Sequence, residues 1–121
     1  MIWYNGKNIK TGAIGKKVGT GHSNTEKIIL AQGNGLYAAK LCSDYYVGEK
    51  KDWFLPSKDE LSLIYENLYK KGIGNLSSTD YWSSSEYELE RVYYQDFNNG
   101  LQDEGYKDFS LNTHVRAVRA F

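Results

Sequence analysis

Few side chains in this sequence have the type and spacing that catalysis or metal binding requires. His22 and His114 are the two histidines, and they lie far apart in the chain. A histidine metal site needs ligands at short spacing, and neither histidine has such a partner. Cys42 is the single cysteine, which excludes an internal disulfide and a cysteine-based zinc cluster. It falls within an apolar stripe, so we interpret it as a core residue and not as a nucleophile.

Three further polar motifs also favour a structural interpretation. The serine run at residues 83–85 lacks the glycines of a nucleophile elbow, and residues 15–17 lack the spacing of a phosphate-binding loop. The carboxylates of residues 103–108 lack the order of oxygen ligands found in an EF-hand, so we interpret them as solvated loop charges. We therefore expect no enzymatic activity, no metal and no cofactor. A remnant hydrolase or oxidase is the alternative.

The composition is that of one globular domain. The chain has 121 residues, of which 40% are hydrophobic and 25% charged, and we expect a single domain over residues 1–121. Fifteen Lys and Arg balance fifteen Asp and Glu, so the basic excess typical of nucleic-acid or membrane-surface binders is missing. The sequence lacks an apolar run long enough for a membrane span, and the Met1 end lacks the apolar segment of a signal peptide.

The first predicted helical region spans residues 24–46. Ser23 and Glu26 fit a capping box at its start. An apolar stripe follows, is interrupted by the Gly-Asn-Gly sequence at residues 33–35, and resumes at helical spacing.

The second predicted helix spans residues 58–71 and is specified at both ends. Ser57 and Glu60 form a second capping box, and Gly72 stands at the position after the last turn. Apolar residues recur at the spacing of one helix face, at Leu61, Ile64, Tyr65 and Leu68.

The second half of the chain is predicted to form short strands. Residues 81–85 and 92–97 have strand character, residues 98–100 form a turn, and a further extended piece begins at Leu101. Residues 115–121 close the chain as a last strand. Together these elements predict two helices and four to six short strands, which is an α+β domain. The expected core contains Trp53, Leu61, Ile64, Leu68, Trp82, Tyr93, Phe97 and Val118.

Residues 87–114 have the composition of a binding surface. Large aromatic side chains alternate there with short polar ones, which combines contact area with adaptable hydrogen bonding. Tyr94 and Asp96 alternate with Tyr93 and Phe97, so we expect the first pair to be exposed and the second buried. An ordinary surface with half-buried tyrosines is the alternative. The candidate ligand-binding residues, expected to form one contiguous patch, are Tyr87, Leu89, Arg91, Tyr94, Asp96, Leu101, Asp103, Tyr106, Asp108, Ser110 and His114.

Four stretches of the sequence resemble the DUF1566 family, also called the Lcl C-terminal domain. They are Asp-Trp-Phe-Leu-Pro-Ser-Lys-Asp-Glu-Leu at 52–61, Tyr-Trp-Ser-Ser-Ser-Glu at 81–86, Val-Arg-Ala-Val-Arg at 115–119, and the region 19–42. The resemblance implies a C-type lectin-like fold in the version shared with formylglycine-generating enzymes. In that fold two helices pack on a small twisted antiparallel sheet, with long irregular loops on one side. The reactive cysteine pair of those enzymes and the calcium motifs of classical lectins are missing from this sequence, so neither activity is expected.

The end of the chain also resembles variable proteins of diversity-generating retroelements, which share this fold. Many of them end in an Arg-Ala-Val-Arg type segment followed by an aromatic residue, as residues 116–121 do. The resemblance implies that positions within 87–114 are diversified, that Trp82, Tyr93, Phe97 and Gly100 are scaffold, and that the domain binds a protein or glycan target. It also suggests display on a cell surface or virion. A structural module of a surface or virion assembly, and a degenerate enzyme of the same fold, are the alternatives.

Overall fold

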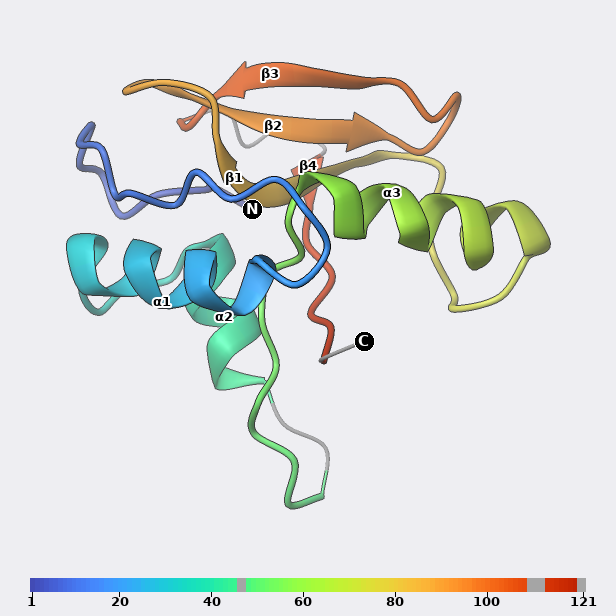
Figure 1. The fold of residues 1–121 in the computed structure, drawn as a ribbon. Coiled ribbons are helices and arrows are strands. Elements are labelled where there is room, and N and C mark those ends of the chain that lie inside the picture. Colours follow the sequence, from blue (N-terminus) through green and yellow to red (C-terminus); the bar gives the residue numbers. More distant parts are fainter. Residues whose placement is uncertain (46–47, 109–112, 120–121) are drawn as a thin grey trace.

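The computed structural model describes residues 1–45, 48–108 and 113–119, which form an α+β fold (Figure 1). Within these ranges three α-helices and one short 3-10 helix accompany a curled sheet of four strands. The helices are α1 (Gly21–Gln32), α2 (Ala38–Asp44), α3 (Lys58–Asn67) and η1 (Tyr69–Lys71). The strands are β1 (Asp80–Glu86), β2 (Arg91–Asp96), β3 (Gln102–Tyr106) and β4 (Thr113–His114). In these ranges, every helix is too short or too polar to cross a bilayer.

The sheet is mixed, and the prediction of an antiparallel sheet is wrong for one strand. The strand order is β3-β2-β1-β4. β1, β2 and β3 form an antiparallel meander through two hairpins. β4 lies parallel to β1, with Thr113 beside Asp80 and His114 beside Tyr81. A chain segment that returns to the sheet after a hairpin can add to the free edge in either direction, and no local sequence signal distinguishes the two.

The predicted helix over residues 24–46 is two helices, α1 and α2. Gly33 adopts a positive φ of 80°, which ends α1 and turns the chain before α2 begins. The capping box at Ser23 does not form, because α1 begins earlier, with Thr20 as its N-cap residue and without a side-chain cap. Residues 46–47, at the end of the predicted span, lie outside the described residues.

Helix α3 begins as predicted, and its capping box is fully formed. The backbone N–H of Ser57 donates to Oε1 of Glu60, and the N–H of Glu60 donates to Oγ of Ser57. The other carboxylate oxygen of Glu60 accepts the N–H of Gly19 at 2.8 Å, so this buried carboxylate also anchors the loop before α1. The predicted last turn is the 3-10 helix η1, which ends at Gly72 with φ 71°.

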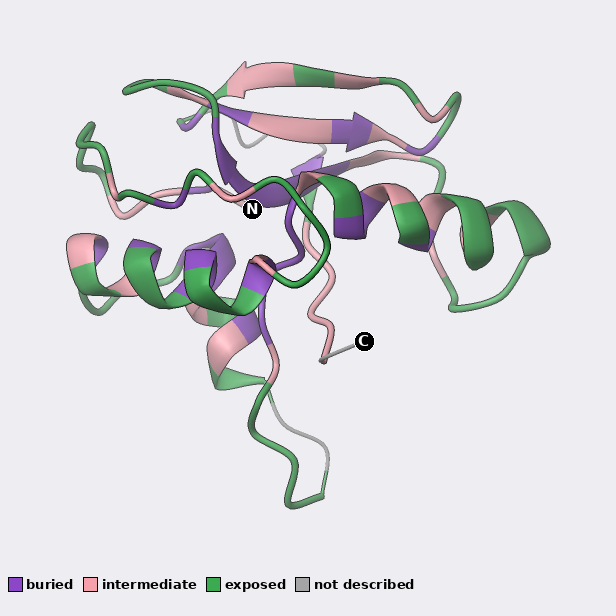
Figure 2. Ribbon diagram, viewed as in Figure 1, coloured by how far each residue is buried: buried purple, intermediate pink, exposed green. Residues whose placement is uncertain are grey.

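Two hydrophobic clusters share the central strand β1, whose residues are almost all buried (Figure 2). Successive side chains of a strand point to opposite faces, so Tyr81 and Trp82 enter different clusters. Trp82 packs with Trp3, which lies close to the N-terminus, and with residues of α1 and α2. Tyr81 packs with Phe97 and the apolar face of α3. Burial on both faces makes β1 the element around which the other segments assemble.

Half of the predicted core is confirmed. Leu61, Ile64, Trp82 and Phe97 are buried. The other four predictions of full burial are wrong. Leu68 is 36% exposed, and only partial burial is found for Trp53, Tyr93 and Val118. Leu68 follows the last residue of α3, where the chain leaves the cluster. Tyr93 lies beside two lysines and the half-exposed ring of Tyr87.

The predicted strand over residues 115–121 is reduced to one bridge in its described part. Phe54 and Val118 exchange two backbone hydrogen bonds of 2.8 and 2.9 Å. Beside them, the guanidinium of Arg119 donates to both carboxylate oxygens of Asp52. The motif at residues 52–61 therefore lies beside the motif at residues 115–119. Contacts of Asp52 and Phe54 hold the segment that contains Val118 and Arg119 in place.

We predict that Phe97→Ala lowers the free energy of unfolding by about 3–5 kcal/mol, because it empties a fully buried site against three tyrosine rings. Urea unfolding followed by tryptophan fluorescence measures the change. Leu101→Ala is the control, since Leu101 is exposed and its truncation should change stability by less than about 0.5 kcal/mol. Equal losses for the two variants would contradict the assigned core.

Candidate functional site

The strand register divides the predicted binding residues between two faces of the sheet. Arg91 lies beside Tyr106, and Tyr94 lies beside Asp103. Because side chains alternate along a strand, the first pair projects from one face and the second pair from the other. The prediction of one contiguous patch is therefore wrong, and the residues form two separate groups.

One face carries an exposed aromatic cluster, the hairpin platform, formed by Tyr87, Arg91, Tyr93 and Tyr106. The guanidinium of Arg91 lies 5.1 Å from the ring centroid of Tyr87 and 5.8 Å from that of Tyr106. Tyr87 also packs edge-on against Tyr93, with ring centroids 5.5 Å apart. Tyr106 is 56% exposed and Tyr87 is 47% exposed. Two rings thus remain open to solvent although their positions are fixed by neighbours.

The tight connection between β1 and β2 holds the platform in place. The backbone N–H groups of Tyr87 and Glu88 both donate to the carbonyl of Arg91. The side chain of Glu88 accepts a 2.6 Å hydrogen bond from Nε of Arg91. This contact lowers the pKa of Glu88 and raises that of Arg91, so both groups are charged at neutral pH. Arg91 is therefore held between two rings by a carboxylate.

Two lysines from outside the predicted region complete this face. Nζ of Lys16 lies 5.2 Å from the ring centroid of Tyr93, and Nζ of Lys58 lies 5.3 Å from it. Sequence reasoning assigned Tyr93 to the buried scaffold and did not single out either lysine for binding. The signal that could have found Lys58 is its position at the start of a well-capped helix, where a cation is unfavourable. For Lys16 no sequence signal existed.

A hollow of about 280 Å³ lies next to the hairpin platform. Ile14, which is 70% exposed, lines it opposite Tyr87 and Glu88. Leu89, at the tip of the same hairpin, is also exposed. The platform therefore continues into an open depression with aliphatic as well as aromatic walls.

The other face of the sheet places Tyr94 among carboxylates. The ring of Tyr94 packs edge-on against Trp82 at a centroid distance of 6.3 Å, so Tyr94 is only partly exposed. Burial is the largest cause of the raised pKa of Tyr94, and the charges of Asp80, Asp103 and Asp96 raise this pKa further. The expectation that Tyr94 and Asp96 are freely exposed is wrong, because this side of β2 also packs against a core cluster.

Three further predicted residues are not part of the hairpin platform as defined here. Leu101 is exposed at the β2–β3 turn, where Asp96 accepts the N–H of Asn98. Asp108 is exposed after β3, and His114 is exposed on β4. Ser110 lies outside the described residues.

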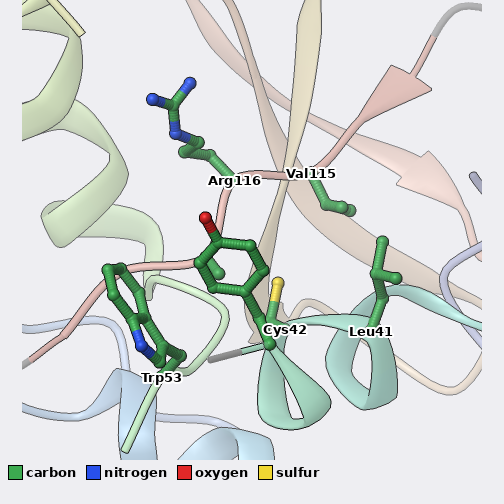
Figure 3. Close-up of a pocket in the computed structure, with 7 residues that line it drawn as sticks. Leu41, Cys42, Trp53, Val115 and Arg116 are labelled. Carbon is green, nitrogen blue, oxygen red and sulfur yellow. The ribbon is translucent and has the colours of Figure 1, made fainter. Parts of the chain in front are cut away.

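A groove of about 420 Å³ runs between α2 and the C-terminal segment (Figure 3). Leu41, Trp53 and Val115 contribute its apolar walls, and Arg116 lies at its rim. Cys42 also lines it, and burial raises the pKa of this thiol to about 12, so the sulfur is protonated and unreactive as a nucleophile at neutral pH. The guanidinium of Arg116 donates to the carbonyls of Gly74 and Asn75. Apolar side chains therefore make up most of the lining of this groove.

Among the residues that the structure describes, the side chains of His, Cys, Asp and Glu do not gather in threes at metal-binding distances. Comparison with known proteins gives no further assignment: no protein-family model, curated protein or solved structure matches the chain.

The two aspartates opposite each other on β1 and β2 give a pH-dependent prediction. Burial and then the charge of Asp96 raise the pKa of Asp80. A carboxyl whose pKa rises on folding destabilises the fold above that pKa, and the penalty disappears when acid protonates the group. Asp80→Asn should therefore stabilise the protein near neutral pH by about 0.5 kcal/mol, the scale of opposed like charges across strands.

Urea unfolding near neutral pH and at about pH 3, below the ordinary aspartate pKa, measures this difference. At the acid pH the variant and the parent protein should have nearly equal stability. Asp108→Asn, at an exposed position, serves as the control and should change stability little at either pH. A larger gain for Asp80→Asn in acid than at neutral pH would contradict the argument.

Proposed function

We propose that this protein is a ligand-binding domain that recognises a protein or glycan surface through the hairpin platform. The observation that carries the proposal is the stack of Tyr87, Arg91 and Tyr106, which is exposed yet fixed by the Glu88 ion pair and by Tyr93. Tyrosine and arginine are the side chains most often responsible for binding energy at interfaces. Side chains that are already ordered lose little conformational entropy on binding.

The α+β architecture supports a C-type lectin-like fold as part of this proposal. We further propose that the domain is a variable protein of a diversity-generating retroelement. A rigid sheet that presents side chains from a hairpin allows those side chains to change without loss of the fold.

Exposure suggests which of the candidate positions could be diversified at least cost. Tyr87, Leu89, Leu101, Asp103, Tyr106 and Asp108 are exposed, so replacing them removes little packing. Tyr94 contacts Trp82, and Asp96 caps the β2–β3 turn, so changes there affect stability as well as recognition. A reverse transcriptase gene and a near-copy repeat beside the coding sequence, with adenines at the variable codons, would test the retroelement assignment directly.

We predict that Tyr106→Ala and Tyr87→Ala abolish measurable binding with little change in thermal stability, since truncating such an anchor costs about 2 kcal/mol or more in an interface. A library of short random peptides and an array of glycans, each probed with the whole chain, supply the ligands. Titration by fluorescence anisotropy compares the parent protein with each variant. Both tyrosines are about half exposed, so thermal unfolding should shift little.

Tyr94→Ala is the matched comparison, because it removes the same side chain from the other face of the sheet. It should lower thermal stability, through its contact with Trp82, and leave binding intact in the folded protein. The proposal would be overturned if neither library yields a ligand. It would also be overturned if the ligands bind Tyr87→Ala and Tyr106→Ala as tightly as the parent.

A further inference from the structure

We infer that the partner of the hairpin platform is a protein that presents acidic side chains to Lys16 and Lys58. This inference rests on the proposed function and narrows it from a protein or glycan to one class. The two ammonium groups meet at a single ring, that of Tyr93, which belongs to the platform. Positive charge is therefore concentrated at one edge of the exposed aromatic surface.

Both lysines extend from backbone that is held in place by hydrogen bonds. The N–H of Lys58 donates to Oγ of Ser85 at 2.9 Å, and the N–H of Asp59 donates to the carbonyl of Lys16 at 2.9 Å. Next to Lys16, the carbonyl of Gly15 accepts hydrogen bonds from Ser85 and from the side chain of Asn24. The ammonium groups are thus carried by fixed segments from two distant parts of the sequence.

Neither ammonium group forms an ion pair with a carboxylate of the described residues. Glu104 lies directly across from Tyr93 in the sheet, yet it is not within ion-pair distance of Lys16 or Lys58. Among the described residues, acidic partners are found for five other cations, Lys40, Lys70, Arg91, Lys107 and Arg119, and not for exposed lysines such as Lys51 and Lys71. The charge beside Tyr93 is therefore available to an incoming group.

Lys58 also occupies a position that is unfavourable for folding. It is the first residue of α3 after the N-cap Ser57, where the helix dipole favours an anion and disfavours a cation. Asp59 and Glu60 follow the dipole preference in the same turn. A residue that opposes the local rule without an internal partner is typical of a functional position.

The surroundings favour a protein over a glycan as the source of the acidic groups. Ile14 and Leu89 expose aliphatic surface beside the platform, and Ile14 lines the hollow next to Tyr87. A protein partner supplies apolar side chains for such surface, whereas a sugar presents mainly hydroxyl groups. Aromatic and arginine side chains with an aliphatic depression and a charged rim match the anatomy of protein interfaces. Charge complementarity at that rim calls for aspartate or glutamate on the partner.

The test is the double charge reversal Lys16→Glu with Lys58→Glu. The probes are short peptides selected from a random library on the whole parent chain, and the glycan array is the comparison arm. Selected peptides should be enriched in Asp and Glu beside aromatic or aliphatic residues. Their dissociation constants should rise by about tenfold or more on the double variant at low salt, because attraction becomes repulsion. The difference should shrink in high salt, where screening is strong.

Lys51→Glu with Lys71→Glu is the matched control. It produces the same change in net charge at two exposed lysines, one in the loop after α2 and the other in η1. Its affinity for the peptides should stay within about twofold of the parent value, because distant charges are screened. Thermal unfolding shows whether the test variant is folded. An anion at position 58 suits the helix dipole, so the melting temperature should not fall.

The possible results distinguish failure of the acidic-partner inference from failure of the proposed function. Peptides without acidic enrichment, or peptides that bind the double variant as tightly as the parent, would overturn the inference. So would lysine-dependent binding that appears on carboxylated or sulfated glycans and not on peptides. Loss of binding in Tyr106→Ala without loss in the double variant would leave the proposed function standing and remove only the acidic partner. Failure of both sets of variants to change binding would remove the proposed function itself.

Discussion

The buried hydroxyl of Ser85 holds together the two backbone segments that carry Lys16 and Lys58 beside the hairpin platform. It accepts the N–H of Lys58 and donates to the carbonyl of Gly15, so one side chain of β1 links the start of α3 to the N-terminal segment. A larger side chain at this fully buried position would push both segments away. Because Lys16 follows Gly15 directly, the same hydroxyl holds the backbone from which both lysines extend toward Tyr93. The serine run at residues 83–85 thus contributes to the structure through this hydroxyl.

The sequence predicts well those parts of the fold that are fixed by residues close together in the sequence. Helix α3 carries its capping box and its terminal glycine within its own sequence, and both form as expected. The alternation in β2 is also correct, but the buried side could not be chosen, because both faces of β2 pack against other segments. Lys16 was missed for a different reason. Its place beside Tyr93 results from hydrogen bonds to residues far along the chain, and such tertiary contacts have no local signature.

A buried ion pair limits how much of the region 87–114 is free to vary. Nζ of Lys107 lies 3.5 Å from Oε1 of Glu86 and donates to the carbonyl of Ile9, and its side chain is fully buried. Burial lowers the pKa of Lys107, while the charge of Glu86 and their hydrogen bond oppose that shift. Thr11 donates to the same carboxylate from the N-terminal segment. Removing one partner of such a pair leaves an uncompensated buried charge, so the end of β3 belongs to the scaffold even though Tyr106, the preceding residue, is exposed.

The zero net charge of the chain conceals an uneven distribution of charge across the sheet. Asp80, Asp96 and Asp103 surround Tyr94 on one face, and their charges raise its pKa. On the opposite face the ammonium groups of Lys16 and Lys58 meet Tyr93. A net charge of zero therefore argues against a uniformly basic surface, but it does not determine the charge of any one face of the molecule. An acidic partner would be repelled from the Tyr94 face and attracted to the Tyr93 face, so the same sheet would orient the encounter before any contact forms. Strand alternation separates the candidate residues into two groups, and the same alternation would leave an acidic partner with one favourable side of the sheet.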